Sequence, residues 1–445
     1  MTEHEAHPNH STAFLTDMYE LTMLDAAIKS GTADRQCTFE VFSRKLSNER
    51  RYGVVAGTAR VLDAVSRFRF TQQQLESAGF LSDAAKAYLC DYSFTGQIDG
   101  YREGELYFPH SPIMTVRGTF AECVILETVI LSILNADSAI ASAASRMVTA
   151  AGGRTLMEMG SRRTHERAAV TAARAAYLAG FDTTSNLEAA KEYGIPATGT
   201  SAHAWTLLYV DDNGEPDEAA AFRAQVDSLG PGTTLLVDTF DITRGVENAL
   251  AVAGTELGAV RIDSGDLGIV SHSVREQLDR AGAFNTRIIV SSDLDEFVIA
   301  GLRGDPIDGF GVGTSLVTGS GVPTAGMVYK LVEVEGHPVA KRSSGKTTYG
   351  GSKSAMRSYR SSGVAVSELV YPFEQEIKLK PRLDYRRMDV PLMRDGAIVD
   401  DLATLEESRA HLAAARTTLP WEGLALSRNE PAIPTHFIGF PEPAE

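Results

Sequence analysis

The chain has 445 residues, of which 43% are hydrophobic and 22% are charged, and its formal net charge is −16. These values are ordinary for a soluble folded protein of more than one domain. The acidic balance excludes a nucleic-acid scaffold, which needs clustered Lys and Arg. Small phosphorylated substrates stay compatible, because they need only a local cationic pocket.

The cysteine count and the absence of targeting segments predict a cytoplasmic protein. Cys37, Cys90 and Cys123 are far apart and match neither a CxxC motif nor zinc spacing. A disulfide framework is not expected, and we therefore expect the protein to lie in a reducing compartment. Residues 1–16 lack the basic and apolar regions of a signal peptide, and no run of 18 apolar residues predicts a membrane span.

The first third of the chain predicts a mixed α/β domain. Residues 15–28 have the spacing of an amphipathic helix, whose apolar face is expected to carry Leu15, Met18, Tyr19, Met23 and Ala26. Strands and turns alternate from residue 35 onward. Residues 123–135, CVILETVILSILN, predict a strongly apolar helix, and we place a domain boundary just after it.

From about residue 150 to 335, short apolar runs alternate with amphipathic helices. The predicted strands are residues 155–160, 181–186, 195–200, 233–240, 258–264, 286–292, 309–317 and 327–334. Before one of the helices, Asp293 and Glu296 have the spacing of a capping box. Strands that alternate with helices predict a parallel sheet. About eight such units without a GxGxxG fingerprint favour a closed or nearly closed barrel over a dinucleotide-binding fold.

Three parts are therefore predicted. Residues 1–135 form an N-terminal α/β domain, residues 136–340 form the α/β barrel, and residues 341–445 form a C-terminal segment that packs beside the N-terminal domain.

The predicted strands of the barrel end in polar residues, and in parallel barrels these ends carry the chemistry. Arg162 and Arg163 suit a carboxylate or phosphate, or else form a surface ion pair. Asn186 suits a ligand contact or caps the next helix. His203 follows a Gly-Thr-Ser run and is either a functional or a satisfied buried histidine.

Two further strand ends have the same ambiguity. Asp263 and Asp266 suit Mg²⁺ held through water, or else cap a helix. Gly311 and Gly313 bring backbone N–H groups to a phosphate, or else permit a tight turn. Together, such features on five strand ends predict an enzyme that acts on a phosphorylated sugar.

Ordered motifs then identify a family. From about residue 11 to 360 the chain resembles nicotinate phosphoribosyltransferases, in the stretches LTDMYELTM, TFEVFSRKL, MGSRR, AAYLAGFDTTSN, YGIPATGTSAHAW, LVDTFD, VRIDSGDL, IIVSSDLDE, GFGVGTSLVT and VYKLVEV. The resemblance implies an N-terminal α/β domain, completed by the C-terminal segment, followed by an incomplete (β/α) barrel. It also implies a homodimer with the site at the subunit interface.

The implied reaction transfers phosphoribosyl from phosphoribosyl pyrophosphate to nicotinate and gives nicotinate mononucleotide, the salvage step toward NAD. Mg²⁺ is the implied metal, and ATP is a co-substrate that phosphorylates a histidine. By position that histidine is His203, which with Arg261 and Asp263 is expected to be catalytic. The implied metal residues are Asp263 and Asp266.

The resemblance also implies the residues that contact substrates. They are Tyr19 on the pyridine ring, Ser161, Arg162 and Asn186 beside the nicotinate, Ser201 next to the histidine, and Gly313 and Thr314 around the 5′-phosphate. Relatives that use nicotinamide have aspartate where this chain has Asn186, and an amide is easier to reconcile with an anionic base.

Three rival readings stay open. A nicotinamide enzyme is disfavoured by Asn186, and the shorter quinolinate enzymes, which use no ATP, are disfavoured by the chain length and by His203. A catalytically silent, ligand-binding barrel is disfavoured because the whole set of polar residues is retained. Departures from the family pattern occur at residues 164–167, and the basic segment 341–360 has no assigned role.

Overall fold

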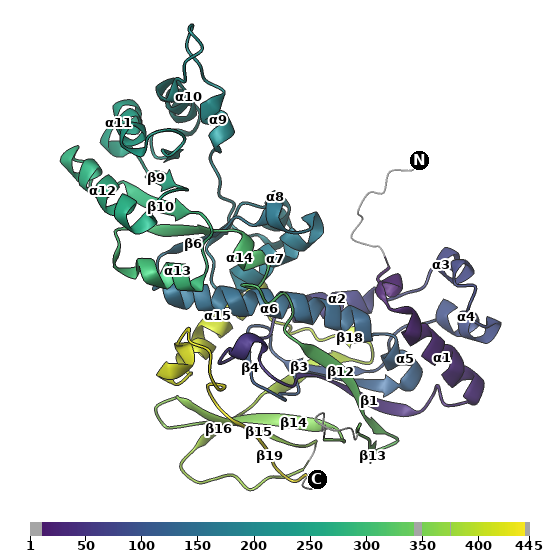
Figure 1. Ribbon diagram of the computed structural model, residues 1–445. Coiled ribbons are helices and arrows are strands. Elements are labelled where there is room, and N and C mark those ends of the chain that lie inside the picture. Colours follow the sequence, from purple (N-terminus) through teal and green to yellow (C-terminus); the bar gives the residue numbers. More distant parts are fainter. Residues whose placement is uncertain (1–10, 342–348, 374, 441–445) are drawn as a thin grey trace. The chain divides into compact units, whose positions relative to one another are not determined.

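The computed structural model describes residues 11–341, 349–373 and 375–440 (Figure 1). The predicted basic segment at 341–360 therefore lies partly outside the described residues. The chain divides into two compact units. The first unit combines the residues up to Ser142 with those from Val322 onward, and the second unit is Ala143–Gly321.

The first unit is built on mainly antiparallel sheets. Its seven-stranded sheet has the order β13-β12-β1-β5-β3-β17-β18. These strands are β1 (Gln36–Ser43), β3 (Gln97–Tyr101), β5 (Met114–Thr119), β12 (Met327–Val334), β13 (His337–Pro338), β17 (Asp389–Arg394) and β18 (Ala397–Ile398). Strand β12 pairs antiparallel with β1. The prediction that residues 327–334 are a barrel strand is therefore wrong, because an apolar strand pattern does not reveal which sheet the strand joins.

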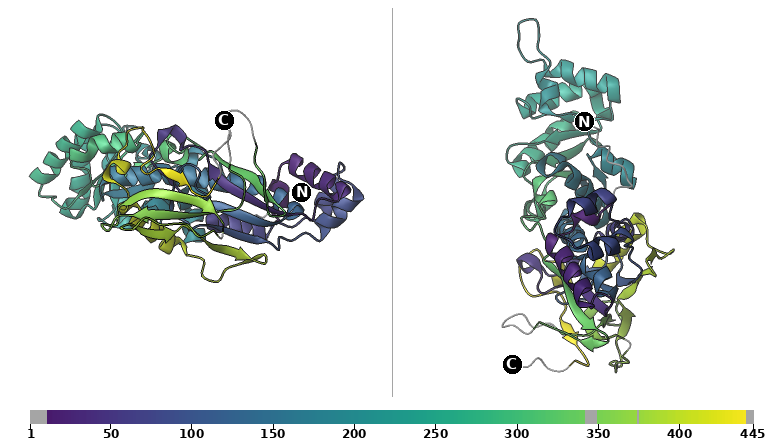
Figure 2. Two further views of the ribbon diagram at one scale, coloured as in Figure 1. Left: turned by 90° about the horizontal axis from the view of Figure 1, so that it is seen from below. Right: turned by 90° about the vertical axis from the view of Figure 1, so that its right-hand side faces the viewer.

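Two smaller sheets complete the strands of this unit. A four-stranded sheet has the order β16-β14-β15-β19, and β2 pairs with β4. The strands are β2 (Gly53–Val54), β4 (Leu106–Tyr107), β14 (Lys353–Tyr359), β15 (Ala365–Pro372), β16 (Asp384–Arg387) and β19 (Thr435–Phe437). In the view from below, the four-stranded sheet lies at the front of its unit (Figure 2).

A buried ion cluster links these sheets. The Arg357 guanidinium bonds Glu105 at 2.7 Å and Glu368 at 2.7 Å, and all three side chains are at most 1% exposed. Glu105 also accepts hydrogen bonds from Arg386 and His411, both at 2.8 Å. Charges this deeply buried need such pairing, so the cluster joins β4 to β14, β15, β16 and the helix that carries His411.

The first unit also contains helices. They are α1 (Met18–Ser30), α2 (Thr58–Ser66), α3 (Gln72–Ser77), α4 (Asp83–Cys90), α5 (Phe120–Val124) and α15 (Leu405–Thr417), with short 3-10 turns at Ala13–Leu15, Ser47–Glu49 and Trp421–Leu424. Its core contains aromatic side chains such as Phe39, Phe68 and Tyr329.

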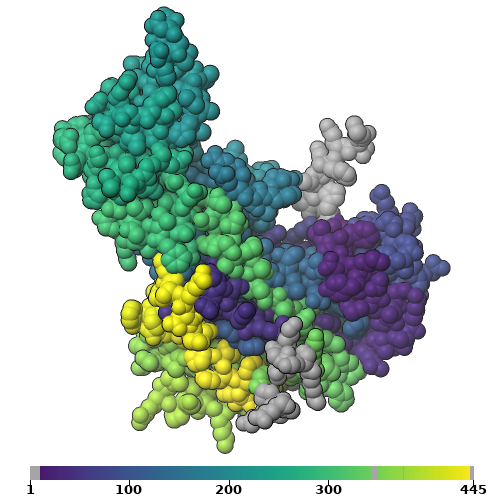
Figure 3. Space-filling model, viewed as in Figure 1, coloured from purple at the N-terminus to yellow at the C-terminus, as the bar shows by residue number. Residues whose placement is uncertain are grey.

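The buried face of α1 differs from the prediction. Leu21, Leu24 and Ala27 are buried, whereas Met18 is 59% and Tyr19 is 46% exposed. The helix has two apolar stripes, so periodicity alone does not say which one packs. Glu20 is buried on the packed side because Thr128 donates its backbone N–H to the carboxylate. Figure 3 shows α1, in purple, at the molecular surface.

Helix α6 (Glu127–Ala151) runs through the predicted domain boundary after residue 135. Its sequence contains no Gly or Pro before Gly152 and Gly153, both of which have positive φ, so nothing stops the helix earlier. Among the described residues, Phe120–Ala151 is the one helical stretch apolar and long enough to cross a membrane, but 61% of its most apolar window is buried inside the structure. It is a core helix.

The second unit contains a curled parallel sheet, a half-barrel, with the order β7-β6-β11-β10-β9-β8. Its strands are β6 (Thr155–Glu158), β7 (Thr183–Thr184), β8 (Thr234–Leu236), β9 (Ala259–Ile262), β10 (Arg287–Ser291) and β11 (Gly309–Val312). The prediction of about eight strands is too high. Residues 195–200 contribute only an isolated bridge from Ala197 to Thr184, because Pro196 has no N–H for a ladder.

Helices connect these strands. They are α7 (Glu166–Ala179), α8 (Leu187–Tyr193), α9 (His203–Leu207), α10 (Glu218–Leu229), α11 (Ile242–Ala253), α12 (Leu267–Arg280), α13 (Glu296–Gly301) and α14 (Thr314–Val317), with 3-10 turns at Ser161–Arg163, Gly254–Glu256 and Leu302–Gly304. The predicted capping box is wrong in register. Asp295 caps α13 instead of Asp293, and Glu296 pairs with Arg146 at 3.0 Å.

Candidate active site

The carboxyl ends of the six parallel strands lie at one edge of the half-barrel, so the residues that follow them share that edge. These segments carry most of the predicted site residues, namely Ser161, Arg162, Asn186, Arg261, Asp263, Asp266, Gly313 and Thr314. Ser201 precedes α9, and His203 is its first residue. Tyr19 lies on α1 of the first unit.

The centre of this edge holds a chain of hydrogen bonds between β9 and β10. Arg261 Nε donates to Ser291 Oγ at 3.1 Å, and Ser291 Oγ donates to Asp263 Oδ1 at 2.6 Å. Arg261 Nη1 also donates to the backbone carbonyl of Ser201 at 3.3 Å. Ser291 thus holds both the guanidinium of Arg261 and the carboxylate of Asp263. The remaining N–H groups of Arg261 are available to bind an anion.

The imidazole of His203 faces the same carboxylate. Nε2 of His203 lies 3.8 Å from Asp263 Oδ2, and Nδ1 lies 3.1 Å from the hydroxyl of Thr239. The side chain of His203 is 40% exposed, so it is not the satisfied buried histidine of the rival reading. Its ring is oriented by Thr239 and open to a reactant.

Asp238 holds the segment that carries Asp263 in place. Its Oδ2 accepts the backbone N–H of Asp263 at 2.8 Å and the hydroxyl of Ser264 at 2.7 Å. The carboxylate is buried, and within the described part of the chain its Oδ1 has no hydrogen-bond partner. Asp238 therefore fixes the backbone that presents Asp263.

A second polar group lies on the segments that follow β6 and β7. Asn186 Nδ2 donates to Ser161 Oγ at 3.0 Å, while Asn186 Oδ1 accepts the backbone N–H of Ala189 at 2.9 Å and caps α8. The capping reading of Asn186 is confirmed, and the predicted ligand contact stays a prediction. Arg162, the residue after Ser161, is exposed.

Glycines allow close packing between β6 and β11. A Cβ on Gly160 would lie 2.2 Å from Val317 Cγ1, and one on Gly313 would lie 3.3 Å from the carbonyl of Met159. Gly160 has ordinary backbone angles, so the requirement there is space. Thr314 begins α14 and is exposed.

Asp266 has a structural task. Its Oδ1 accepts the backbone N–H of Ile269 at 3.2 Å and caps α12. No group of three or more His, Cys, Asp or Glu that could hold a metal ion occurs among the described residues. Of the two predicted metal residues, Asp263 is the one whose carboxylate lies next to the other polar side chains of the edge.

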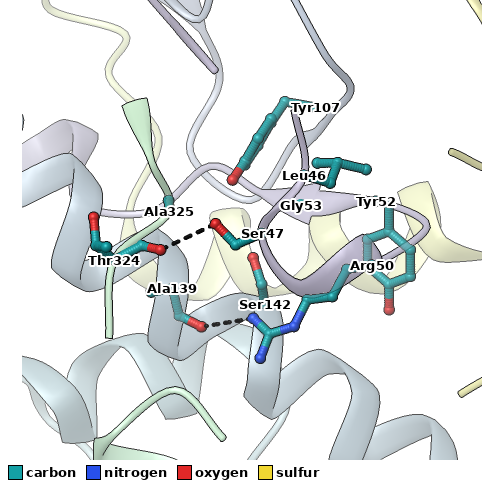
Figure 4. Close-up of a pocket in the computed structure, with 10 residues that line it drawn as sticks. All are labelled: Leu46, Ser47, Arg50, Tyr52, Gly53, Tyr107, Ala139, Ser142, Thr324 and Ala325. Atoms are coloured by element: carbon teal, nitrogen blue, oxygen red, sulfur yellow. Dashed lines mark hydrogen bonds between the residues drawn. The ribbon is translucent and has the colours of Figure 1, made fainter. Parts of the chain in front are cut away.

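The first unit contains a small pocket of a different kind (Figure 4). Its lining is Leu46, Ser47, Arg50, Tyr52, Gly53, Tyr107, Ala139, Ser142, Thr324 and Ala325. Ser47 Oγ donates to the carbonyl of Thr324 at 3.2 Å and Arg50 Nη1 to that of Ala139 at 3.4 Å. These polar groups serve the backbone, so the pocket is a packing feature.

Comparison with known proteins identifies the family. The family model for the N-terminal domain of nicotinate phosphoribosyltransferase matches residues 14–135, and the nicotinate phosphoribosyltransferase family model matches residues 154–362. A nicotinate phosphoribosyltransferase from Mycobacterium tuberculosis is 60% identical over 428 residues, which are 95% of each chain.

The chain belongs to the nicotinate phosphoribosyltransferase family.

Further members of this family agree in sequence and fold. The nicotinate phosphoribosyltransferase of Bacillus subtilis is 38% identical over 73% of this chain and 67% of its own length. The crystal structure of human nicotinic acid phosphoribosyltransferase superposes with a TM-score of 0.80 at 26% identity, covering 94% of this chain and 96% of the human chain.

Sequence reasoning for this family member did not single out four polar residues of the edge as site residues. Thr184, Thr239 and Ser291 each contact a predicted site residue or its backbone, and Glu158 bonds Thr184 and the backbone N–H of Gly160. A signal existed for Glu158, which is a carboxylate inside the apolar strand TLMEMG. Serine and threonine at strand ends carry no comparable signal.

Proposed function

We propose that this chain transfers phosphoribosyl from phosphoribosyl pyrophosphate to nicotinate with coupled ATP hydrolysis, giving nicotinate mononucleotide for NAD salvage. The observation that carries the proposal is that His203, Asp263 and Arg261 meet at one sheet edge. They do so in a chain 60% identical to a protein named nicotinate phosphoribosyltransferase.

Arg261 and Asp263 would handle the pyrophosphate. Glycosyl transfer passes through an oxocarbenium-like state while pyrophosphate departs, so developing negative charge must be neutralised by groups already in place. Arg261 is held by Ser291 and by the Ser201 carbonyl, and this fixed guanidinium is suited to a phosphate. The pyridine nitrogen is itself a nucleophile, so positioning is the main task of the enzyme.

The residues present fit Mg²⁺ bound mainly through substrate. Mg²⁺ commonly takes one or two protein carboxylates together with substrate phosphates and water. Asp263 would supply such a carboxylate, whereas Asp266 already accepts a helix N–H with one oxygen and would act through water. When bound, Mg²⁺ neutralises charge on the departing pyrophosphate.

His203 would take the terminal phosphoryl group of ATP. A ring nitrogen attacks phosphorus, ADP leaves, and a phosphohistidine results. Thr239 orients the ring, and Asp263 stands beside it. Water would later release the phosphate from the histidine.

Nicotinate would lie against Ser161, Arg162 and Asn186. Ser161 and Asn186 offer neutral hydrogen-bond donors, and Arg162 offers a cation, which together suit a carboxylate. Gly313 and Thr314, at the start of α14, would hold the 5′-phosphate through backbone N–H groups and a hydroxyl. Tyr19 would stack on the pyridine ring.

Assembly and architecture belong to the same proposal. We propose a homodimer, supported by the exposed apolar side chains of Leu15, Met18 and Met23 around Tyr19. The half-barrel of the second unit, Ala143–Gly321, would be an incomplete (β/α) barrel, and the first unit would be the N-terminal α/β domain completed by the C-terminal part of the chain. A cytoplasmic location fits the three unpaired cysteines.

The test is product formation from phosphoribosyl pyrophosphate and Mg²⁺ with nicotinate, nicotinamide or quinolinate. We expect nicotinate mononucleotide to form, with little product from the other bases. Preferred turnover of nicotinamide or quinolinate would mean that the chain is a phosphoribosyltransferase for that base instead. Binding of phosphoribosyl pyrophosphate without any product would support the silent barrel.

A further inference from the structure

A closed ring of hydrogen bonds lies at the ends of β6 and β7. Glu158, the last residue of β6, uses both carboxylate oxygens. Its Oε1 accepts the backbone N–H of Gly160, and its Oε2 accepts the hydroxyl of Thr184, both at 2.5 Å. Glu158 is 1% exposed and Thr184 is fully buried.

The ring continues to the pair beside the proposed nicotinate site. Thr184 Oγ1 accepts the backbone N–H of Asn186 at 3.0 Å, and Asn186 Nδ2 donates to Ser161 Oγ at 3.0 Å. Ser161 follows Gly160 in the chain, which closes the ring. The backbone of Ser185 adds a bond to the Glu158 carbonyl at 2.9 Å.

The ring has an unusual composition for a buried acid. Glu158 is held by neutral donors, and burial raises its pKa above the ordinary value, although the Thr184 hydroxyl and the Gly160 N–H oppose that rise. A buried carboxyl without a cation is costly, and such local costs are common at functional sites. Gly160 must also stay small, because an added Cβ would meet Val317.

The α8 cap orients the Asn186 amide, and the ring holds that amide and Ser161 in place, so together they determine which groups face a ligand. The Ala189 N–H can only donate, so Asn186 Oδ1 must be its acceptor and Nδ2 must point to Ser161. Ser161 Oγ accepts from that nitrogen, which leaves its own hydroxyl hydrogen to donate elsewhere. The pair therefore presents donors, and a carboxylate, which only accepts, suits it better than a carboxamide.

We propose that Glu158 and Thr184 are positioning residues that set the Ser161–Asn186 pair and thereby the preference for nicotinate over nicotinamide. The inference rests on the proposed function. Neither residue needs to touch the substrate, since each acts through the pair.

The experiment measures kcat and KM for nicotinate, nicotinamide and phosphoribosyl pyrophosphate. Glu158→Ala and Thr184→Val each remove one link of the ring, and each should raise KM for nicotinate about tenfold or more. The ratio of kcat/KM for nicotinate over nicotinamide should fall, with KM for phosphoribosyl pyrophosphate unchanged within about twofold.

Conservative variants separate positioning from folding. Glu158→Gln and Thr184→Ser keep hydrogen-bonding groups at the same places and should restore most of the discrimination. Asp182→Asn is the matched control, because Asp182 accepts the N–H of Leu156 at the opposite end of the same two strands, at 2.8 Å. It should leave the ratio unchanged.

Two failures are distinguishable. A wild-type enzyme that does not turn over nicotinate contradicts the proposed function itself. An active wild type, with folded Thr184→Val and Glu158→Ala variants that keep the wild-type ratio, overturns the inference alone. Should Glu158→Ala fail to fold, Thr184→Val decides, because valine keeps the shape of threonine.

Discussion

Asn186 Nδ2 donates a hydrogen bond of 3.0 Å to the hydroxyl of Ser161, which joins the segments that follow β7 and β6. The other atom of the amide, Oδ1, caps α8 at the same time. The cap fixes the orientation of the amide, so Nδ2 faces Ser161. The capping role is therefore compatible with the proposed contact of Asn186 with nicotinate.

Replacement of Asn186 by aspartate should weaken nicotinate binding. Aspartate can still cap α8, but its carboxylate would repel the carboxylate of nicotinate. Steady-state kinetics of Asn186→Asp should show KM for nicotinate raised about tenfold or more, with a smaller effect on nicotinamide.

Asn186→Ser is the matched control for that charge. Serine caps a helix as well as asparagine does and adds no charge, so its effect should be clearly smaller. Equal losses in the aspartate and serine variants would mean that repulsion is not the cause.

Loss of Arg261 should lower kcat more than it raises KM. Removing a charge-stabilising donor typically costs about 10²–10³-fold in kcat, and Arg261→Ala should fall in that range. Ser291→Ala should cost about tenfold, because Ser291 holds both Arg261 and Asp263. Ser292, the exposed neighbour of Ser291, supplies the control, and Ser292→Ala should leave kcat unchanged. A normal kcat in Arg261→Ala would remove this residue from the mechanism.

The parallel core of the fold was predictable from the sequence. Strands covered on both faces are continuous apolar runs, and residues 258–264 and 286–292 were recognised for that reason as β9 and β10. What failed was set by tertiary pairing. Residues 327–334 have the same apolar character, yet they pair antiparallel with β1. The prediction of the packed face of α1 is wrong because the helix has a second apolar stripe, and the predicted stripe is the exposed one.

Charged or titratable residues at predicted strand ends made Asp263 and His203 candidates, whereas Arg261 entered through the family resemblance. The structure brings these three side chains together, and their roles stay predictions. Thr239 and Ser291 were not singled out, because small hydroxyl residues at strand ends more often serve turns and caps. Only the structure shows which residue each hydroxyl contacts.

The buried ion cluster of the first unit should dominate its stability. Arg357→Ala would leave Glu105 and Glu368 buried without their common partner, and urea unfolding should show a loss of about 3–5 kcal/mol. The exposed pair of Arg67 with Asp63 is the control, and Arg67→Ala should change the free energy of unfolding by less than about 1 kcal/mol. Similar losses in both variants would contradict the account.

The same cluster predicts a dependence on acid. Burial alone would raise the pKa of Glu105, but Arg357, His411 and Arg386 hold it well below its ordinary value. Its contribution to stability is therefore complete above the unfolded pKa of about 4.3 and is lost as the pH falls below that value. The contribution of Glu105 to the unfolding midpoint should therefore be constant above about pH 5 and should decrease in more acidic buffer. A Glu105→Gln variant should lack that component of the decline.

The exposed stripe of α1 should mediate assembly. Met18→Glu would place a charge among apolar side chains, so sedimentation should show the wild-type dimer converted to monomers. Phe284, which is 70% exposed in the second unit, supplies the control, and Phe284→Glu should remain a dimer. A monomeric wild type at micromolar concentration would refute the assembly.

The central claim is ATP-coupled transfer to nicotinate through His203. The most direct measurement is the initial rate of nicotinate mononucleotide formation with and without ATP, in the wild type and in His203→Ala. We expect ATP to stimulate the wild type, and the variant to retain a slow rate that ATP does not change. ATP stimulation that survives intact in His203→Ala would contradict the account.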